Sequence, residues 1–329
     1  MSDKPTNEDF LQQADPMRRE LLAHCYRMMG SVHDAEDLVQ ETYLRAWRAY
    51  DGFEGRSSLR TWLYRIATTT CLTALESRSK RPLPTGLGAP SSEATAPLTS
   101  DREVPWLEPV PDTMVGAAAD DPAAIVTSRE SIRLALIVAL QHLPPRQRAV
   151  LILRDVLKWR AAEVAEAVGV STAAVNSMLQ RARAQLDEVS PSLDDPVEPL
   201  TDEQRGLLDR YAAAFENYDI DSLVDMFTKD AIWEMPPFVG WYQGPETIVE
   251  LIKIRCPARS RGDLKVVPVA ANGQPAFALY HLRDDVYTQF SIMIPTFDGD
   301  RIRHVGMFFE AALFETFGLP STLEASAAK

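Results

Sequence analysis

The chain has 329 residues, so we expect two or three domains. Its formal net charge of −13 at pH 7 argues against nucleic-acid binding if it is taken over the whole chain, so the charge has to be examined segment by segment. The N-terminus is polar, unlike a secretory signal, and the apolar runs are too short to span a bilayer. We therefore expect a cytoplasmic protein that does not enter a membrane. Three scattered cysteines predict reduced thiols, and no metal site, disulfide framework or other cofactor is expected.

Residues 8–82 are predicted to form a helical domain. Apolar side chains recur at three- and four-residue steps in 33–50, where Asp34 is the expected N-cap, and again in 59–77. In the second of these helices we expect Trp62 to face the core, because it shares its helical spacing with several apolar neighbours.

Residues 83–124 contain seven prolines and little periodicity, which predicts an extended linker without a core of its own. The segment is acidic, with a net charge of −6 over 83–127. Flexible linkers rarely carry a tryptophan and a leucine among their prolines, so we expect this one to dock at Trp106, Leu107 and Pro109.

Residues 125–190 predict a second helical domain, and the part from 128 to 190 has a net charge of +3, the only net-basic block of the chain. A short helix ends there at Gly169, and Ser171 is a good N-cap for the next one, which is the helix-turn-helix pattern. No Asp or Glu occurs from 169 to 186, where a carboxylate would face the phosphate backbone of DNA.

The second helix of this pattern has two different faces. Its inner stripe is expected to be Val175, Leu179, Ala182 and Leu186. Amides and hydroxyls on the other face can read base edges, and arginines can bind phosphate or guanine. The side chains expected to contact DNA are Ser171, Thr172, Ala173, Asn176, Ser177, Gln180, Arg181 and Arg183. Many arginine-rich helical hairpins do not bind DNA, so the motif alone leaves that function open.

Residues 200–320 predict an α+β domain. A capping box at 201–204 opens a helix, a strand and further helices follow, and three strand-like runs separated by turn signals end the segment. Helices followed by an antiparallel meander predict a sheet with helices on one face.

This domain contains candidates for two kinds of site. Asp230, Glu234, His281 and His304 could transfer protons if they were buried, but structural roles are more common for such residues and no carboxylate pair has a fixed spacing here. We therefore expect no enzymatic activity. The aromatic residues that could line a ligand pocket are Trp233, Phe238, Trp241, Tyr242, Tyr280 and Phe290.

Three stretches carry a resemblance to known families. Two of them resemble regions two and four of the extracytoplasmic-function (ECF) sigma factors of bacterial RNA polymerase. The resemblance to region two lies in DAEDLVQETYLRAWRAY and SSLRTWLYRIATTTCLTAL, and the resemblance to region four lies in LPPRQRAVLILRDVLKWRAAEVAEAVGVSTAAVNSMLQRARAQL. AIWEMPPFVGWYQGPE is similar to SnoaL-like domains, whose cystatin-like fold encloses an apolar cone. Some ECF sigma factors carry such an extension, and the Trp-Leu linker motif looks like theirs.

The resemblance implies roles for particular residues. Asp37, Gln40 and Glu41 would contact the clamp helices of the polymerase β′ subunit, and region four would bind the β flap. The helix-turn-helix would bind the promoter minus-thirty-five element, and the acidic linker would run through the RNA exit path. Region two would melt the minus-ten element, with DNA contacts from Arg60, Arg65, Thr69 and Arg78.

The expected function is promoter-specific initiation of transcription by core polymerase. The C-terminal domain would regulate this activity in cis, and a small apolar ligand bound there could be the signal. The recognition helix has few cations, so we expect the isolated chain to bind promoter DNA weakly. The alternatives are a ligand-responsive helix-turn-helix regulator, which leaves residues 20–80 unexplained, and a SnoaL-class enzyme with an appended DNA-binding module.

Overall fold

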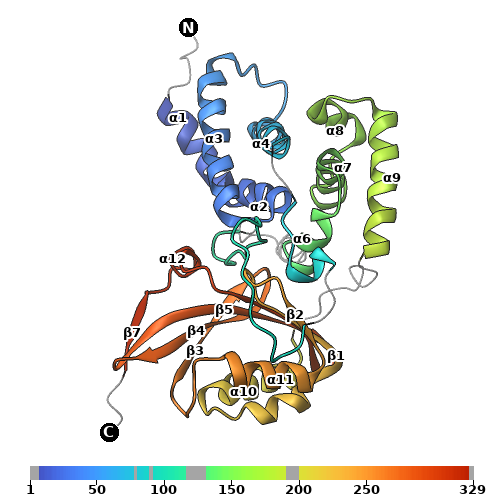
Figure 1. Cartoon of the computed structure of the whole chain (residues 1–329). Coiled ribbons are helices and arrows are strands. Elements are labelled where there is room, and N and C mark those ends of the chain that lie inside the picture. The colour runs from blue at the N-terminus through green and yellow to red at the C-terminus, as the bar shows by residue number, and fades with distance from the viewer. Residues whose placement is uncertain (1–6, 78–79, 89–91, 116–130, 190–199, 326–329) are drawn as a thin grey trace. The chain divides into compact units, whose positions relative to one another are not determined.

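The computed structural model divides the chain into two compact units (Figure 1). It describes residues 7–77, 80–88, 92–115, 131–189 and 200–325. Each unit combines two separate parts of the chain: Met1–Arg81 with Leu107–Pro196 in the first, and Pro82–Trp106 with Val197–Lys329 in the second. The linker is therefore shared between the units.

The first unit is mainly helical in its described residues. Its helices are α1 (Asn7–Ala14), α2 (Arg18–Met29), α3 (Val32–Ala49), α4 (Leu59–Leu75), α6 (Leu134–Gln141), α7 (Pro145–Leu151), α8 (Ala161–Val168) and α9 (Thr172–Val189). A π-helical turn, Ile152–Val156, continues α7. Within the part of the chain described here, none of the helices is both long and apolar enough to cross a membrane.

Helix α3 begins one turn earlier than Asp34 would place it. Ser31 is the N-cap, because its backbone is extended and its side chain accepts a hydrogen bond from the backbone N–H of Asp34 at 3.1 Å. Asp34 lies in the first turn, where its charge still favours the helix dipole. The expectation that Asp34 caps the helix was therefore wrong.

The buried face of α4 differs from the expected one at Trp62. Leu63, Tyr64, Ala67 and Cys71 are buried, whereas Trp62 is only partly buried. Small and weakly polar side chains fill this core, so the face cannot be identified from the largest apolar residues. Trp62 belongs instead to an aromatic cluster at the surface, described below.

Region 134–189 follows the predicted pattern at its C-terminal end. Gly169 has a left-handed φ of 71° and ends α8, and the Ser171 hydroxyl accepts from the N–H of Ala174 at 3.2 Å as α9 begins. Val175, Leu179 and Ala182 are buried. The apolar helix α6 begins at Leu134, after a turn at residues 131–132.

The second unit is the predicted α+β domain. Its helices are α10 (Asp202–Glu216), α11 (Pro245–Arg255) and α12 (Ala312–Thr316), with a 3-10 turn at Ile220–Met226. Its strands are β1 (Phe227–Glu234), β2 (Trp241–Gln243), β3 (Leu264–Ala271), β4 (Gln274–Arg283), β5 (Val286–Asp298), β6 (Arg301–Phe308) and β7 (Thr322–Glu324).

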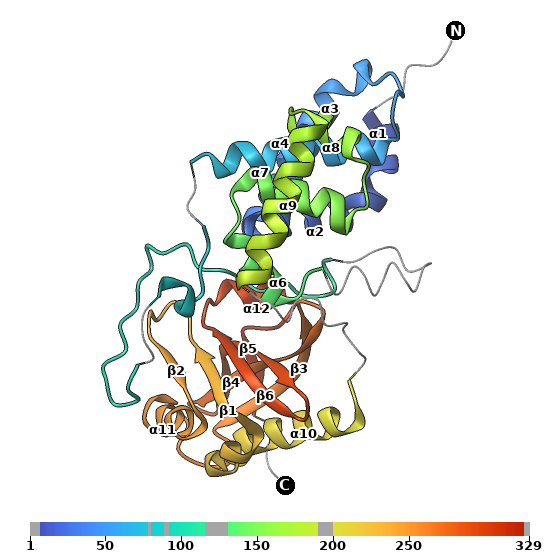
Figure 2. The ribbon, with the colours of Figure 1, turned by 90° about the vertical axis from the view of Figure 1, so that its right-hand side faces the viewer.

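The strands form one sheet in the order β2-β1-β6-β5-β4-β3, with β7 paired to β5. Only the β1–β6 pair is parallel among these described pairings. Helices α10 and α11 cover one face of the curved sheet (Figure 2). Strand β3 escaped prediction because Pro268 interrupts its apolar pattern, yet an edge strand tolerates proline.

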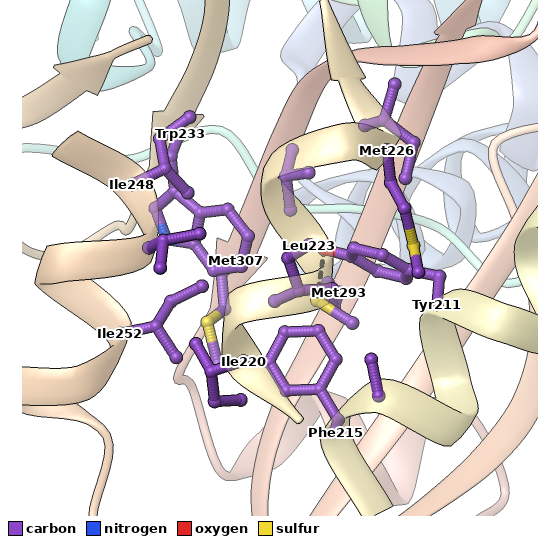
Figure 3. Close-up of a cluster of buried hydrophobic side chains, with 14 of the residues drawn as sticks. Tyr211, Phe215, Ile220, Leu223, Met226, Trp233, Ile248, Ile252, Met293 and Met307 are labelled. Atoms are coloured by element: carbon purple, nitrogen blue, oxygen red, sulfur yellow. Dashed lines mark hydrogen bonds between the residues drawn. The ribbon is translucent and has the colours of Figure 1, made fainter. Parts of the chain in front are cut away.

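The core of this unit lies between the sheet and these two helices (Figure 3). Tyr211, Phe227 and Trp233 are fully or almost fully buried in it. The Tyr211 hydroxyl donates to the Met293 sulfur at 3.4 Å, which gives this polar group a partner in an apolar surrounding.

The first half of the linker is not the independent extended segment that its prolines suggest. Within Pro82–Trp106, Leu83 and Ala94 are buried. Ser100 forms a β-bridge with Phe238, and the segment runs beside β2, where the N–H of Ser92 donates to the carbonyl of Trp241 (Figure 2). The linker therefore adds to the sheet of the second unit through backbone hydrogen bonds, which leave no periodic signal in the sequence.

Candidate nucleic-acid interface and cavity

The outer face of α9 is exposed as the helix-turn-helix pattern predicts. The exposed side chains are Ser171, Thr172, Ala173, Asn176, Ser177, Gln180, Arg181 and Arg183. Arg183 is nevertheless engaged, because its guanidinium donates to both carboxylate oxygens of Asp155 at 2.9 and 2.7 Å. A DNA phosphate would have to compete with this bidentate pair. Arg181 lies on the same face, and no carboxylate among the described residues forms an ion pair with it.

The arginines expected on the minus-ten surface are also paired with acids. Arg60 donates to Glu20 at 2.7 Å and lies over the ring of Tyr64. Arg65 donates to Glu166, which belongs to α8. Arg78 lies outside the described residues. The structure thus places carboxylates of the chain itself where phosphates are expected.

A surface hollow of about 700 Å³ lies beside α4. Trp62 and Phe53 form an aromatic wall, with ring centroids 4.9 Å apart, and Thr69 lines the hollow as well. Aromatic faces of this kind stack unpaired bases. Glu166 and Ala167 of α8 form part of the rim. Sequence reasoning missed Phe53 and placed Trp62 in the core, although two aromatic residues near arginines are also a signal for nucleic-acid binding.

A second exposed stripe runs along α3. Asp37 and Gln40 are exposed, and Glu41 is partly exposed and accepts from Arg45 at 2.7 Å. Leu44 and Trp47, with exposures of 46% and 44%, lie on the same side at helical spacing. These two residues were missed because their spacing also fits a core position. Exposed apolar side chains of this size are typical of a protein contact.

The second half of the linker docks on the N-terminal end of α3. Leu107 and Pro109 are buried, and the Glu108 carboxylate accepts from the Ser31 hydroxyl at 2.7 Å and lies 2.9 Å from His33 Nδ1. Burial opposes ionisation of Glu108, but the hydrogen bonds from His33 and Ser31 outweigh it and lower the pKa of Glu108. The same hydrogen bond raises the pKa of His33. Glu108 was not predicted as a docking residue.

Trp106 belongs to the other unit. Its indole N–H donates to the carbonyl of Asp101 at 2.7 Å, within the linker segment that follows the sheet. The predicted docking residues are thus divided between the two units, with the division falling between Trp106 and Leu107.

Two buried guanidinium groups join α2 to the part of the chain that follows the linker. Arg27 donates to the carbonyl and hydroxyl oxygens of Ser131, at 3.0 and 2.6 Å. Arg148 donates to the carbonyls of Met28 and Leu143 and to both oxygens of Gln141. Burial lowers the pKa of each guanidinium to about 10. These acceptors are neutral oxygens, so the contacts carry the desolvation cost of two cations.

The second unit contains a cavity of about 600 Å³ next to its core. Three of the six predicted pocket residues, Trp233, Phe238 and Phe290, line it. Trp241, Tyr242 and Tyr280 are not among the lining residues, which corrects the prediction. The lining comes from both the domain and the linker: Leu98, Ser100, Arg102, Phe215, Trp233, Met235, Pro237, Phe238, Leu251, Ile252, Arg255, Cys256, Leu279, Phe290, Met307, Phe309, Glu310 and Ala311.

Tyr280 shows why half of the aromatic residues miss the cavity. Its ring packs edge-on against Phe314 at 5.2 Å, and its hydroxyl donates to the carbonyl of Pro320. Alternate residues of a strand face opposite sides of the sheet, and Tyr280 lies next to Leu279, which does line the cavity. The register could not be read from the sequence because both faces of β4 are apolar.

The residues considered for proton transfer lie elsewhere. Glu234 is almost fully buried, 2.7 Å from His304 Nε2, and accepts from the N–H of Thr85 in the linker. Asp230 is exposed and His281 is partly exposed beside Arg283. None of these four residues lines the cavity. The Glu234–His304 pair is thus part of the linker attachment.

Comparisons with known proteins cover all three parts of the chain. The family models that match are Sigma-70 region 2 at residues 15–81, Sigma-70 region 4 at 133–186 and a SnoaL-like domain at 208–309. The chain is 60% identical to the ECF RNA polymerase sigma factor SigG of Mycobacterium tuberculosis, strain H37Rv, over 96% of this chain and 85% of that protein.

More distant relatives agree with this. ECF RNA polymerase sigma factor SigJ of the same organism is 30% identical over 74% of this chain and 72% of its own length. The crystal structure of SigJ matches with a TM-score of 0.61 and 23% identity, covering 94% of this chain and all of that one. At this identity the match concerns the fold.

Proposed function

The chain belongs to the ECF sigma factors of RNA polymerase, with a SnoaL-like domain at its C-terminal end, and on this premise we propose that it binds core polymerase and directs promoter-specific initiation. The observation that carries the proposal is the pair of exposed surfaces in the first unit. One is the acid-free face of α9, and the other is the aromatic hollow beside α4. A helix-turn-helix regulator would leave the hollow without a role.

The stripe on α3 is the proposed contact with the polymerase β′ clamp. Asp37, Gln40 and Glu41 supply its polar part, as expected from the sequence, and Leu44 and Trp47 supply apolar area at its edge. A large exposed aromatic residue next to charged ones has the composition of a protein-interface anchor. Region four, including α7 to α9, would bind the β flap.

The described form of the first unit is proposed to be a closed state. Glu166 of α8 binds Arg65 and lines the hollow beside α4, so α8 occupies part of the surface that the minus-ten element needs. Binding to core polymerase would separate α8 from α4 and release Arg65 for phosphate. This supports weak promoter binding by the isolated chain and tight binding by the holoenzyme.

The C-terminal domain is proposed to regulate this separation in cis, without catalysis. It holds Pro82–Trp106, and the next residues of the chain dock at the N-terminal end of α3. Shifting the linker on the domain would therefore act on the helix that carries the proposed polymerase contact. A role beside core polymerase also agrees with the expected location in the cytoplasm.

Purified core polymerase provides the test of the proposed function. The full chain should co-elute with core and yield promoter-specific transcripts, and truncation after residue 199 should change their amount. Leu44→Ala should weaken co-elution, whereas Leu11→Ala, which removes an exposed leucine from α1, should not. Absence of co-elution for the unmodified chain would refute the proposal.

A further inference from the structure

The cavity of the second unit has one polar group that lacks a partner. Trp233 lines the cavity and is 1% exposed, and within the described part of the chain its indole N–H has no hydrogen-bond acceptor. Figure 3 shows the ring packed among Ile248, Ile252 and Met307. A buried donor left without an acceptor costs about 1–3 kcal/mol. An acceptor on a bound molecule would remove this cost.

Charged groups border the same cavity. Arg102 and Arg255 line it, together with one acid, Glu310. Arg255 uses one of its terminal nitrogens to donate to the carbonyls of Thr95 and Ala96. Arg102 is exposed, and no carboxylate among the described residues forms an ion pair with it. The lining is therefore apolar inside, with an excess of positive charge at the exposed end.

We infer that this cavity binds a small organic acid with a largely apolar body. Its body would lie against Phe215, Leu279 and Met307, an acceptor oxygen within the body would receive the Trp233 N–H, and its carboxylate would lie at Arg102 and Arg255. A cavity of about 600 Å³ lies within the range of sites that enclose molecules of drug size. Binding of the acid does not depend on the proposed function; only the effect of the bound acid on transcription rests on that function.

The linker is part of this binding site. Leu98, Ser100 and Arg102 line the cavity, and this segment is held by hydrogen bonds from Asp101 N–H to the Pro237 carbonyl and from Val239 N–H to the Thr99 carbonyl, both 2.9 Å. A ligand that contacts both walls binds only when the linker is in place. It therefore stabilises the docked linker by its own binding free energy.

Three matched compounds test the ligand class with the full-length chain. Benzoylbenzoate, the anion of benzoylbenzoic acid, has an aromatic body, a central ketone and a carboxylate. The anion of benzylbenzoic acid has a methylene group in place of the ketone, and benzophenone lacks the carboxylate. Calorimetric titration should give the tightest binding for benzoylbenzoate, with losses of about tenfold without the carboxylate and about fivefold without the ketone. Equal affinities for all three compounds, or no binding, would overturn the inference.

Variants assign each contact. Arg102→Ala should reduce the preference for benzoylbenzoate over benzophenone at least about threefold, while Arg261→Ala, an exposed arginine that does not line the cavity, should leave it unchanged. Trp233→Phe should abolish the preference for benzoylbenzoate over the anion of benzylbenzoic acid. Ala311→Trp, at an exposed lining position, should block all three compounds without disturbing the core. Unaltered preferences in these variants would refute the assigned contacts.

Transcription with core polymerase separates this inference from the proposed function. If the compounds bind as described but neither ligand nor truncation after residue 199 alters transcription, regulation in cis is wrong and the binding site stands. If truncation alters transcription but no compound binds, the regulatory role stands and the ligand class is wrong.

Discussion

In the first unit, two buried guanidinium groups add polar contacts between α2, Ser131 and α7 to the buried apolar side chains of these helices, whereas the sheet and helices of the second unit meet in a cluster of buried apolar side chains. Hydrogen bonds from a buried cation to neutral oxygens contribute less net stability than their number suggests, because water would solvate the same groups after separation. The free energy gained by burying apolar side chains is not offset in this way, because water does not solvate these groups favourably after separation. The first unit is therefore suited to opening, and the second to remaining folded while it holds a linker and a ligand.

The strongest test of this contrast removes part of the apolar core. Phe227 is fully buried between Tyr211 and Trp233, so Phe227→Ala should lower the free energy of unfolding of the second unit by about 3–5 kcal/mol. Hydrogen exchange should show lost protection in α10 and unchanged protection in α2. Val286→Ala, at a position 38% exposed, is the control and should change little. Equal losses in both units would contradict the division.

Acid should destabilise the first unit through His24. Burial, and then the nearby charge of Arg27, lower the pKa of this imidazole to about 3 from 6.5, so the unfolded chain binds a proton that the folded one excludes. Stability is therefore lost as pH falls below the unfolded value of 6.5, by about 1.4 kcal/mol per pH unit and about 2.5 kcal/mol between pH 6 and 4.

His24→Leu isolates this effect from other titrations. His33, whose pKa is raised, contributes with the opposite sign, since its stabilisation is present at low pH and is lost as pH rises through its folded pKa. The difference between the variant and the unmodified chain, measured as exchange protection of α2 and α4 against pH, should show the His24 slope. Parallel pH profiles would exclude it.

Removing one of the buried guanidinium groups should loosen the first unit by about 2 kcal/mol. Arg148→Met relieves the desolvation of a cation but leaves the carbonyls of Met28, Gln141 and Leu143 without their donor. We expect faster exchange in α2 and a larger radius of gyration in solution. Arg146→Met, on the exposed side of α7, should have neither effect. A compact, fully protected Arg148→Met chain would show that apolar packing holds these helices together.

The contact between α8 and α4 should give the smallest effect. Glu166→Gln removes the partner of Arg65, and exposed pairs of this kind contribute about 0.2–1 kcal/mol. Transcription by the holoenzyme should rise by a factor of about two to five, because the open state becomes more accessible. Glu76→Gln removes an exposed acid from the end of α4 and serves as the control. A decrease with Glu166→Gln would contradict the closed-state proposal.

Local signals in the sequence account for most of the fold. The cap at Ser171, the end of α8 at Gly169 and the apolar stripe of α9 follow from neighbouring residues, and so do α10, α11, β1, β4, β5 and β6 in the second unit, but not β3. The position of Trp62 on α4 did not, because Tyr64, Thr68 and Cys71 are buried beside Leu63 and Ala67, and these weakly polar side chains do not mark a buried stripe.

Contacts between distant residues explain the remaining gaps. The pairs Arg65–Glu166 and Arg183–Asp155 form between residues 101 and 28 positions apart, so the expected DNA contacts could be placed on an exposed face but not recognised as already paired. Leu98, Ser100 and Arg102 line the cavity only because the linker pairs with the sheet through its backbone. The roles of the predicted DNA- and polymerase-binding residues remain predictions.

The shared linker also has a consequence during protein synthesis. The ribosome completes one wall of the cavity at Arg102 before it makes the opposite residues Met307 to Ala311, about 200 residues later. At about 5–20 residues per second, the interval lasts roughly 10–40 s. Every newly made chain thus passes through a stage in which both promoter-facing modules exist while the ligand site does not.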